Sequence, residues 1–372
     1  MRKSSLILLV LASLLLASAC SRQDTAEGRL TFYSDVLGNH DIYITDPRSS
    51  KLTYVTDSLP GEGAPAWSPD GTRLAYYARS DRYRDVFVAR ADGSAVVNLT
   101  DNPAEDALPA WSPDGARIAF YSDRAGNGDV YVMDADGSGP RRLTVSPAAD
   151  FPYGWSPDGT RIAFGSLRGG NLDIYVMNAD GSGQRRLTDD PAPDRRPAWS
   201  PDSARIAFES ERNGNAEIYV MSADGSHSIN VTVSSLADTF PVWSPDGTRI
   251  AFVSLREGNR EVYVMDVTYS YLARVTSAPR EDSWPAWSPD SARVAFVSNR
   301  DFNSEIYAAN PDGSQSTRLT NDRAPDSGPA WSPDGSRIAF GSFREGAIEV
   351  YVMNADGSAQ KRIASVPVRR GT

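Results

Sequence analysis

Acidic residues recur at two fixed positions along this chain of 372 residues, and their carboxylates are its main candidates for chemistry. The first series comprises Asp41, Asp85, Asp129, Asp173, Glu217, Glu261, Glu305 and Glu349. The second series comprises Glu62, Asp106, Asp150, Asp194, Asp238, Asp282 and Asp326. Two carboxylates suffice for glycoside hydrolysis, and a ring formed by the second series could attract a cation or a basic segment.

An arginine that recurs with the same spacing offers a structural alternative to the acidic ring. It appears as Arg124, Arg168, Arg212, Arg256, Arg300 and Arg344. Charge-assisted hydrogen bonds from this arginine could satisfy either acidic series. The sequence alone leaves the ring and the ion pairs open as alternatives.

Other kinds of catalytic site find little support. His40 and His227 are the only histidines and fall in different repeats, which argues against a histidine-based metal site. No G-x-S-x-G motif is present, and the Asp-Gly turns are too short for an EF-hand. We therefore expect a protein that is not an enzyme and has no catalytic, cofactor-binding or metal-binding residues, hence no cofactor.

The elements that position these residues form a repeat. The pentapeptide W-S-P-D-G, or W-S-P-D-S, occurs seven times in steps of 44 residues, at Trp67, Trp111, Trp155, Trp199, Trp243, Trp287 and Trp331. A fixed period of this length is typical of a repeat architecture. A large apolar residue needed in every unit is best explained by packing between units, so we expect these tryptophans to be structural.

Each unit reads as four short β-strands. In the unit that begins at Trp111, residues 117–122 and 129–133 are rich in β-branched and aromatic residues, Asp136-Gly137 is a hairpin signal, and residues 142–144 form a further short run. The segment 109–112 supplies the remaining strand. No helical periodicity appears, so we predict an all-β fold, a β-propeller of eight four-stranded blades. Seven blades are the alternative, because the first unit lacks the W-S-P-D motif; residues 365–368 could complete its sheet.

The N-terminus has the features of an export signal. Arg2 and Lys3 precede an apolar run over residues 6–16, and the small residues 17–19 precede Cys20, the only cysteine. This arrangement resembles bacterial lipoproteins, which implies lipidation of Cys20; ordinary cleavage after Ala19 is the alternative. We predict a lipoprotein signal peptide over residues 1–19, a lipidated tether over 20–27 and a single propeller domain over 28–372. Ser21, where an Asp would favour the inner membrane, implies an outer-membrane protein that faces the periplasm.

The repeat resembles the WD40-like propeller repeats of the TolB family. The resemblance rests on W-S-P-D-G, R-I-A-F, I-Y-V-M-N-A-D-G-S and R-R-L-T, as they stand between Trp155 and Thr188. It covers residues 28–364 and implies the propeller alone, because TolB carries an α/β domain ahead of its propeller and only Ser21–Glu27 occupy that place here. A role in the Tol–Pal system therefore does not carry over from the resemblance.

Specificity in a repeat protein is expected where the copies differ. The segment just before the tryptophan varies most, and in units four to seven it carries Phe151, Tyr153, Arg195, Arg196, Phe240 and Trp284. Aromatic residues and arginine are enriched at binding hot spots, so these residues are the candidate partner-binding site. The alternative is that they seal the joints between blades.

Three functions remain open after these exclusions. We favour a monomeric, lipid-anchored scaffold that binds an envelope protein or peptide, which could be basic because the chain has a net charge of −10. An acidic chain without a basic run argues against nucleic acid as a partner. The alternatives are a glycan-binding or carboxylate-based glycan-active propeller and a passive structural lipoprotein.

Overall fold

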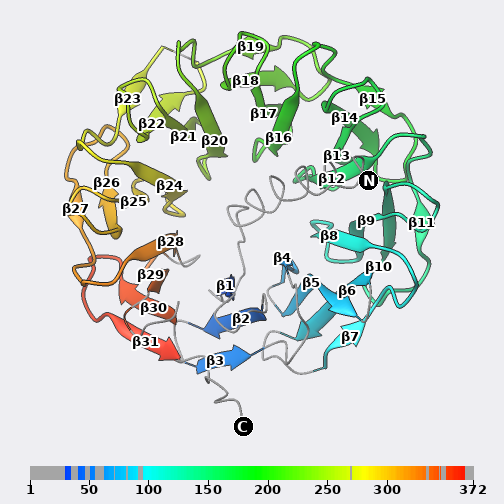
Figure 1. The fold of residues 1–372 in the computed structure, drawn as a ribbon, viewed down its shortest axis with the longest axis horizontal. Helices are drawn as coiled ribbons and strands as arrows, with labels where there is room; N and C mark the ends of the chain where they lie inside the picture. The colour runs from blue at the N-terminus through cyan, green and yellow to red at the C-terminus, as the bar shows by residue number, and fades with distance from the viewer. Residues whose placement is uncertain are drawn as a thin grey trace, which may run out of the picture.

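The computed structural model describes residues 30–34, 41–46, 51–54, 63–70, 72–80, 83–90, 95–268, 270–331, 335–342, 344 and 349–364. Within these residues every helix-or-strand element is a β-strand, and the strands form eight antiparallel sheets. Figure 1 shows the sheets following one another around a central axis, each blade in chain order. The all-β propeller predicted from the repeat is confirmed.

Three strands form the first sheet, and four form each of the others, in chain order. The first three sheets contain β1 (Leu30–Ser34), β2 (Asp41–Asp46) and β3 (Lys51–Tyr54); β4 (Gly63–Trp67), β5 (Arg73–Ser80), β6 (Tyr83–Arg90) and β7 (Val97–Asn98); and β8 (Asp106–Trp111), β9 (Arg117–Ser122), β10 (Asp129–Asp134) and β11 (Arg141–Arg142). The fourth and fifth contain β12 (Asp150–Trp155), β13 (Arg161–Ser166), β14 (Asp173–Asn178) and β15 (Arg185–Arg186); and β16 (Asp194–Trp199), β17 (Arg205–Ser210), β18 (Glu217–Ser222) and β19 (Ile229–Asn230). The last three contain β20 (Asp238–Trp243), β21 (Arg249–Ser254), β22 (Glu261–Asp266) and β23 (Leu272–Arg274); β24 (Asp282–Trp287), β25 (Val294–Ser298), β26 (Glu305–Ala309) and β27 (Thr317–Arg318); and β28 (Asp326–Trp331), β29 (Arg337–Ser342), β30 (Glu349–Asn354) and β31 (Lys361–Ala364).

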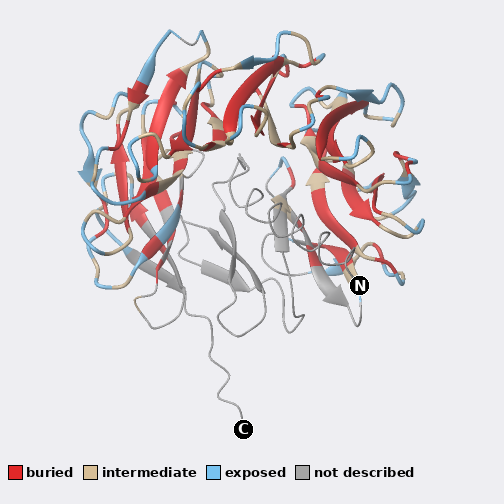
Figure 2. Cartoon of the chain, turned by 45° about the horizontal axis from the view of Figure 1, so that its top comes forward, coloured by how far each residue is buried: buried red, intermediate tan, exposed pale blue. Residues whose placement is uncertain are grey.

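The first strand of each four-stranded sheet lies nearest the axis, and the fourth lies at the outer edge (Figure 1). The middle strands are the most buried, as Figure 2 shows, while many of the connecting turns are exposed. The apolar core lies between blades: one cluster joins Val130 and Leu143 of the third sheet to Trp155, Phe164 and Met177 of the fourth. The described repeats thus pack their apolar faces against neighbouring repeats.

The ring closes where the last sheet meets the first, because β31 lies beside β3. The proposed closing segment, residues 365–368, lies outside the described residues, as do the signal segment 1–19, Cys20 and the tether 20–27. Within the described residues, no helix is long and apolar enough to span a bilayer.

The W-S-P-D-G motif forms a tight turn between the first two strands of a sheet. In the third sheet the buried Ser112 hydroxyl bonds the Asp114 carboxylate, and it accepts the backbone N–H of Arg117 at 3.0 Å. Gly115 follows with φ of +67°, a left-handed conformation that costs glycine little. The turn thus sets the angle at which the tryptophan enters the joint between sheets.

Candidate functional site

The recurring loop arginine forms an ion pair with the second acidic series. The pairs, with their N–O distances, are Arg124–Asp106 (3.1 Å), Arg168–Asp150 (2.7 Å), Arg212–Asp194 (3.0 Å), Arg256–Asp238 (2.9 Å), Arg300–Asp282 (3.5 Å) and Arg344–Asp326 (2.9 Å). Each pair joins the start of the innermost strand to the loop between the second and third strands of the same sheet. Of the two alternatives left by the sequence, the structure shows the ion pairs.

The six paired carboxylates of the second acidic series therefore do not form a solvent-exposed acidic ring. The six paired aspartate side chains have 0% exposure, and Glu62 lies outside the described residues. Burial disfavours the charged carboxylate. It raises the pKa of Asp282 to about 6 despite Arg300, and it also raises the pKa of Asp238 and Asp326. These groups are buried in the sheets and are not available to a basic ligand.

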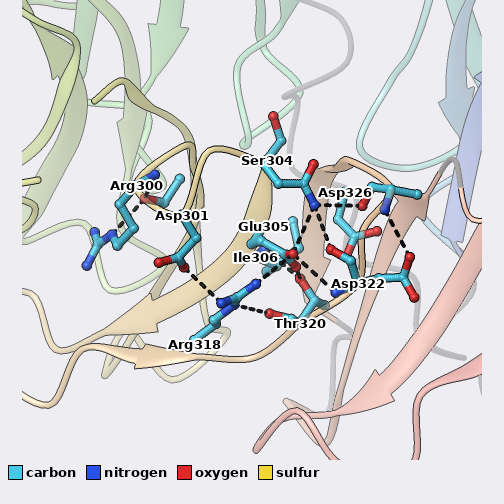
Figure 3. A network of polar contacts seen from close by, with 12 residues as sticks. Arg300, Asp301, Ser304, Glu305, Ile306, Arg318, Thr320, Asp322 and Asp326 are labelled. Atoms are coloured by element: carbon cyan, nitrogen blue, oxygen red, sulfur yellow. Dashed lines mark hydrogen bonds and ion pairs between the residues drawn. The ribbon is translucent and has the colours of Figure 1, made fainter. Parts of the chain in front are cut away.

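The first acidic series has partners of its own. In Figure 3, Glu305 of β26 accepts hydrogen bonds from Arg318 at 2.8 Å and Thr320 at 2.6 Å. The same arginine position serves Asp129, Asp173 and Glu261, through Arg142, Arg186 and Arg274 at 2.6, 2.8 and 2.9 Å. This second arginine was not among the residues predicted from the sequence, although it recurs in the R-L-T or R-V-T run of these repeats. Both acidic series are thus part of the scaffold.

The motif tryptophans lie in the joints between sheets. Their indole N–H donates to a backbone carbonyl on the innermost strand of the preceding sheet, with N–O distances of 2.9 to 3.2 Å, at Trp111, Trp155, Trp243, Trp287 and Trp331. A guanidinium of the preceding sheet covers the indole ring of Trp111, Trp155, Trp243 and Trp287, as Arg205 covers Trp243 at 5.0 Å. The side chain of Trp67 lies outside the described residues.

Trp199 differs from the other tryptophans. Its buried Nε1 atom has no hydrogen-bond partner among the described residues, although Arg161 covers its ring at 4.8 Å. The corresponding acceptor would be the carbonyl of Gly154, which lies in an irregular part of β12 with φ of +150°. The joint between the fourth and fifth sheets is therefore built differently from the others.

The variable segment forms a β-bulge on the innermost strands. Leu108, Arg196, Phe240 and Trp284 occupy equivalent positions 44 residues or a multiple of 44 apart, and their φ angles are +55°, +51°, +58° and +57°. The pairing register shifts at each of these positions, and a proline follows each one. Bulky residues rarely adopt this conformation, which costs about 1–3 kcal/mol, and such strain clusters at functional sites.

Three of the predicted partner-binding residues form one continuous surface, here called the inner-rim ladder: Arg196, Phe240 and Trp284. The Arg196 guanidinium lies 4.8 Å from the centre of the Phe240 ring, and the ring centres of Phe240 and Trp284 lie 6.5 Å apart. These residues come from β16, β20 and β24, the innermost strands of three consecutive sheets. All three are half-buried, so each also presents surface to solvent.

The other three predicted binding residues are placed differently. Phe151 is fully buried and stacks on Tyr121 with ring centres 5.6 Å apart, so assigning it to a binding surface was wrong; alternation along β12 turns it inward. Tyr153 is half-buried over Gly165, and burial raises its pKa to about 12. Arg195 forms an exposed ion pair with Glu211 at 2.6 Å.

One functional candidate escaped the sequence analysis. Glu209 of β17 has a side chain that is 5% exposed and lies 2.5 Å from the Arg196 guanidinium. Its counterparts at the repeat spacing are Tyr33, Tyr77, Tyr121, Gly165, Val253, Val297 and Gly341. A lone charged residue in an otherwise uncharged position was the signal that could have revealed it.

No feature of the described residues indicates a metal or cofactor site. They contain no group of three or more side chains suited to binding a metal ion. His227 is exposed in the turn between β18 and β19 with φ of +56°, while His40 is not described.

Several solved structures are similar to this chain, and they include two enzymes and a protein described as a putative TolB. Putative TolB from Agrobacterium tumefaciens is 28% identical, with 62% of this chain and 86% of that chain covered and a TM-score of 0.49. Oligogalacturonate lyase from Vibrio parahaemolyticus is 15% identical, with 89% and 98% covered and a TM-score of 0.57. Dipeptidyl peptidase 4 from Porphyromonas gingivalis is 13% identical, with 82% and 53% covered and a TM-score of 0.59, so this chain matches about half of that enzyme.

The family comparison covers most of the sequence. No curated protein gives a significant match. The family model of the TolB beta propeller domain matches residues 7–152, 147–239 and 224–368. Together with the eight radial sheets and the motif tryptophans in their joints, this match shows that the chain belongs to the TolB beta propeller domain family.

Proposed function

We propose that this protein is a non-enzymatic scaffold that binds a protein or peptide of the cell envelope. We further propose that a lipid on Cys20 anchors it to the outer membrane, facing the periplasm. The inner-rim ladder is the observation that carries the proposal, because planar side chains from three sheets meet on one half-buried surface. Clustered aromatic and arginine side chains of this kind are typical of binding hot spots.

The ladder also suggests how a partner is recognised. The innermost strands carry Pro109, Pro197, Pro241, Pro285 and Pro329. Proline has no N–H to donate to an added strand, and the adjacent bulges interrupt the regular ladder of backbone groups. Binding at this edge therefore relies on side chains and not on the addition of a β-strand from the partner.

The buried acids support a non-enzymatic role. A carboxylate pair that cleaves a glycosidic bond must reach the substrate, whereas the paired acids of both series are buried and bonded to arginine. Glu209, which bonds Arg196 of the ladder, is also buried and paired.

The test is an affinity capture from solubilised envelope with the exported protein. Phe240→Ala and Trp284→Ala remove the ladder, and Tyr271→Ala is a matched control because Tyr271 is an exposed aromatic residue next to the outermost strand β23. Circular dichroism checks that all variants fold. We expect a partner that the parent and the control retain and that both ladder variants lose. Equal retention by all variants would reject the ladder as the binding surface.

A further inference from the structure

Glu209 occupies the point where two sheets meet beneath the inner-rim ladder. It lies on β17 of the fifth sheet, and its two carboxylate oxygens have different partners. Oε2 accepts a hydrogen bond from the Arg196 guanidinium at 2.5 Å, within the same sheet. Oε1 accepts the backbone N–H of Phe240 at 2.9 Å, from the sixth sheet. One side chain thus connects two neighbouring members of the ladder.

This connection holds both residues in an unfavourable backbone conformation. Arg196 and Phe240 have φ angles of +51° and +58°, which persist only when surrounding contacts enforce them. A bulge also leaves backbone groups without a partner on the adjacent strand, and Glu209 supplies the acceptor for the Phe240 N–H.

Trp284 depends on the same arrangement indirectly. It has a φ of +57°, but the residue equivalent to Glu209 in its neighbouring sheet is Val253, which has no acceptor to offer. The placement of the Trp284 ring therefore rests on its packing against Phe240 and against the apolar cluster of the seventh and eighth sheets. Releasing Phe240 removes the first of these two supports.

We propose that Glu209 is a positioning residue that fixes Arg196, Phe240 and Trp284 as one preformed surface for the partner. This inference rests on the proposed function, since it assigns a role to Glu209 in the same surface. Because Glu209 neutralises Arg196, and because separating a buried ion pair is costly, the surface offers uncharged planar faces. It fits a peptide segment with ring-bearing or other apolar side chains better than it fits a carboxylate or phosphate group.

Two substitutions separate positioning from general stability. Glu209→Val introduces the side chain found at this position in the next two sheets, Val253 and Val297, so the fold is expected to tolerate it. Glu209→Gln keeps an oxygen acceptor for the Phe240 N–H and loses the charge that holds Arg196. Glu211→Gln is the matched control, because Glu211 lies two residues further along, its side chain is 42% exposed and its carboxylate pairs with Arg195, outside the ladder.

The first readout needs no partner. The near-ultraviolet dichroism of Trp284 is obtained by subtracting the spectrum of Trp284→Phe in each background. We expect this signal to change with Glu209→Val, to change less with Glu209→Gln and to stay unchanged with Glu211→Gln.

The second readout is retention of the partner that the parent captures from solubilised envelope. We expect at least a tenfold loss with Glu209→Val and none with Glu211→Gln. An unchanged Trp284 signal in Glu209→Val overturns the positioning role, and so does equal loss of retention in the control. If the parent captures nothing, the proposed function fails, while the Trp284 signal still decides the role of Glu209.

Discussion

The unusual joint at Trp199 leads to a quantitative prediction about two tryptophans of the same motif. Trp243 donates its indole N–H to the carbonyl of Ala198 at 3.0 Å, whereas the buried Nε1 of Trp199 has no partner among the described residues. Both rings are covered by an arginine, at 4.8 Å for Trp199 and 5.0 Å for Trp243. Replacing each with phenylalanine therefore removes similar volume and similar cation–π contact but only one hydrogen bond.

The expected difference follows from the energetics of that bond. A typical hydrogen bond contributes about 0.5–1.5 kcal/mol net, and leaving a buried polar group unpaired costs about 1–3 kcal/mol. Trp243→Phe loses the bond, whereas Trp199→Phe removes a buried donor that has no partner among the described residues. We expect Trp243→Phe to lower the free energy of unfolding by about 2 kcal/mol more than Trp199→Phe.

The assay is equilibrium unfolding in urea, followed by circular dichroism. Repeat proteins can depart from two-state behaviour, so the comparison uses the difference in midpoints between two variants with equal slopes. Equal destabilisation by the two single substitutions would refute the assignment of a missing bond at Trp199.

Three further predictions concern the ion pairs, the packing of the fourth sheet and the response to pH. Arg256→Ala leaves the buried Asp238 without a counter-ion and should lower the free energy of unfolding by about 3–5 kcal/mol. Arg195→Ala breaks an exposed ion pair and should lower it by less than about 1 kcal/mol. Unfolding in urea compares the two variants, and similar costs would contradict the role of burial. Gly165→Ala would place a Cβ 2.8 Å from the Tyr153 ring and should cost about 1–3 kcal/mol, an effect that should shrink in a Tyr153→Ala background if this contact is its cause. Burial raises the pKa of Asp282 to about 6, so the folded protein binds a proton on this carboxylate more tightly than the unfolded chain does. This difference stabilises the folded state fully below the pKa of the unfolded chain, and the stabilisation is lost as the pH rises through 6. The melting temperature should therefore rise between pH 7.5 and pH 5, by less in Asp282→Asn, and an identical pH profile in that variant would remove Asp282 as the cause.

The architecture was predictable from the sequence because every repeat carries the same turn-forming residues and the same alternation of apolar residues. The expected strand over residues 117–122 coincides with β9, and the expected strand over 129–133 differs from β10 by one residue. Turn-forming residues set the strand ends, and alternation sets the buried face, in each unit alike. Repetition over seven motif copies made the prediction secure.

The candidate site was only partly predictable, because it depends on the direction of side chains. Phe151 and Phe240 both belong to the variable segment, but Phe151 packs inward and Phe240 lies in a left-handed bulge. The X-Pro pairs indicate an irregularity, yet they do not say which way it turns a side chain. Glu209 was missed because the variable segment was compared between repeats and the second strand was not.

The bonds in the joints also bear on how such a ring can change over generations. The Trp111 and Trp243 bonds each span 45 residues, and the Arg73 and Arg205 bonds to the next turn each span 42 residues. A recombination event that adds or removes one whole unit leaves the same donor facing an equivalent acceptor across the new junction. An insertion or deletion whose length is not a multiple of the repeat places the indole against a strand that does not offer the equivalent acceptor. Such a gene can therefore diversify by exchanging whole units, because each unit carries the indole donor for one joint and the carbonyl acceptor for the next.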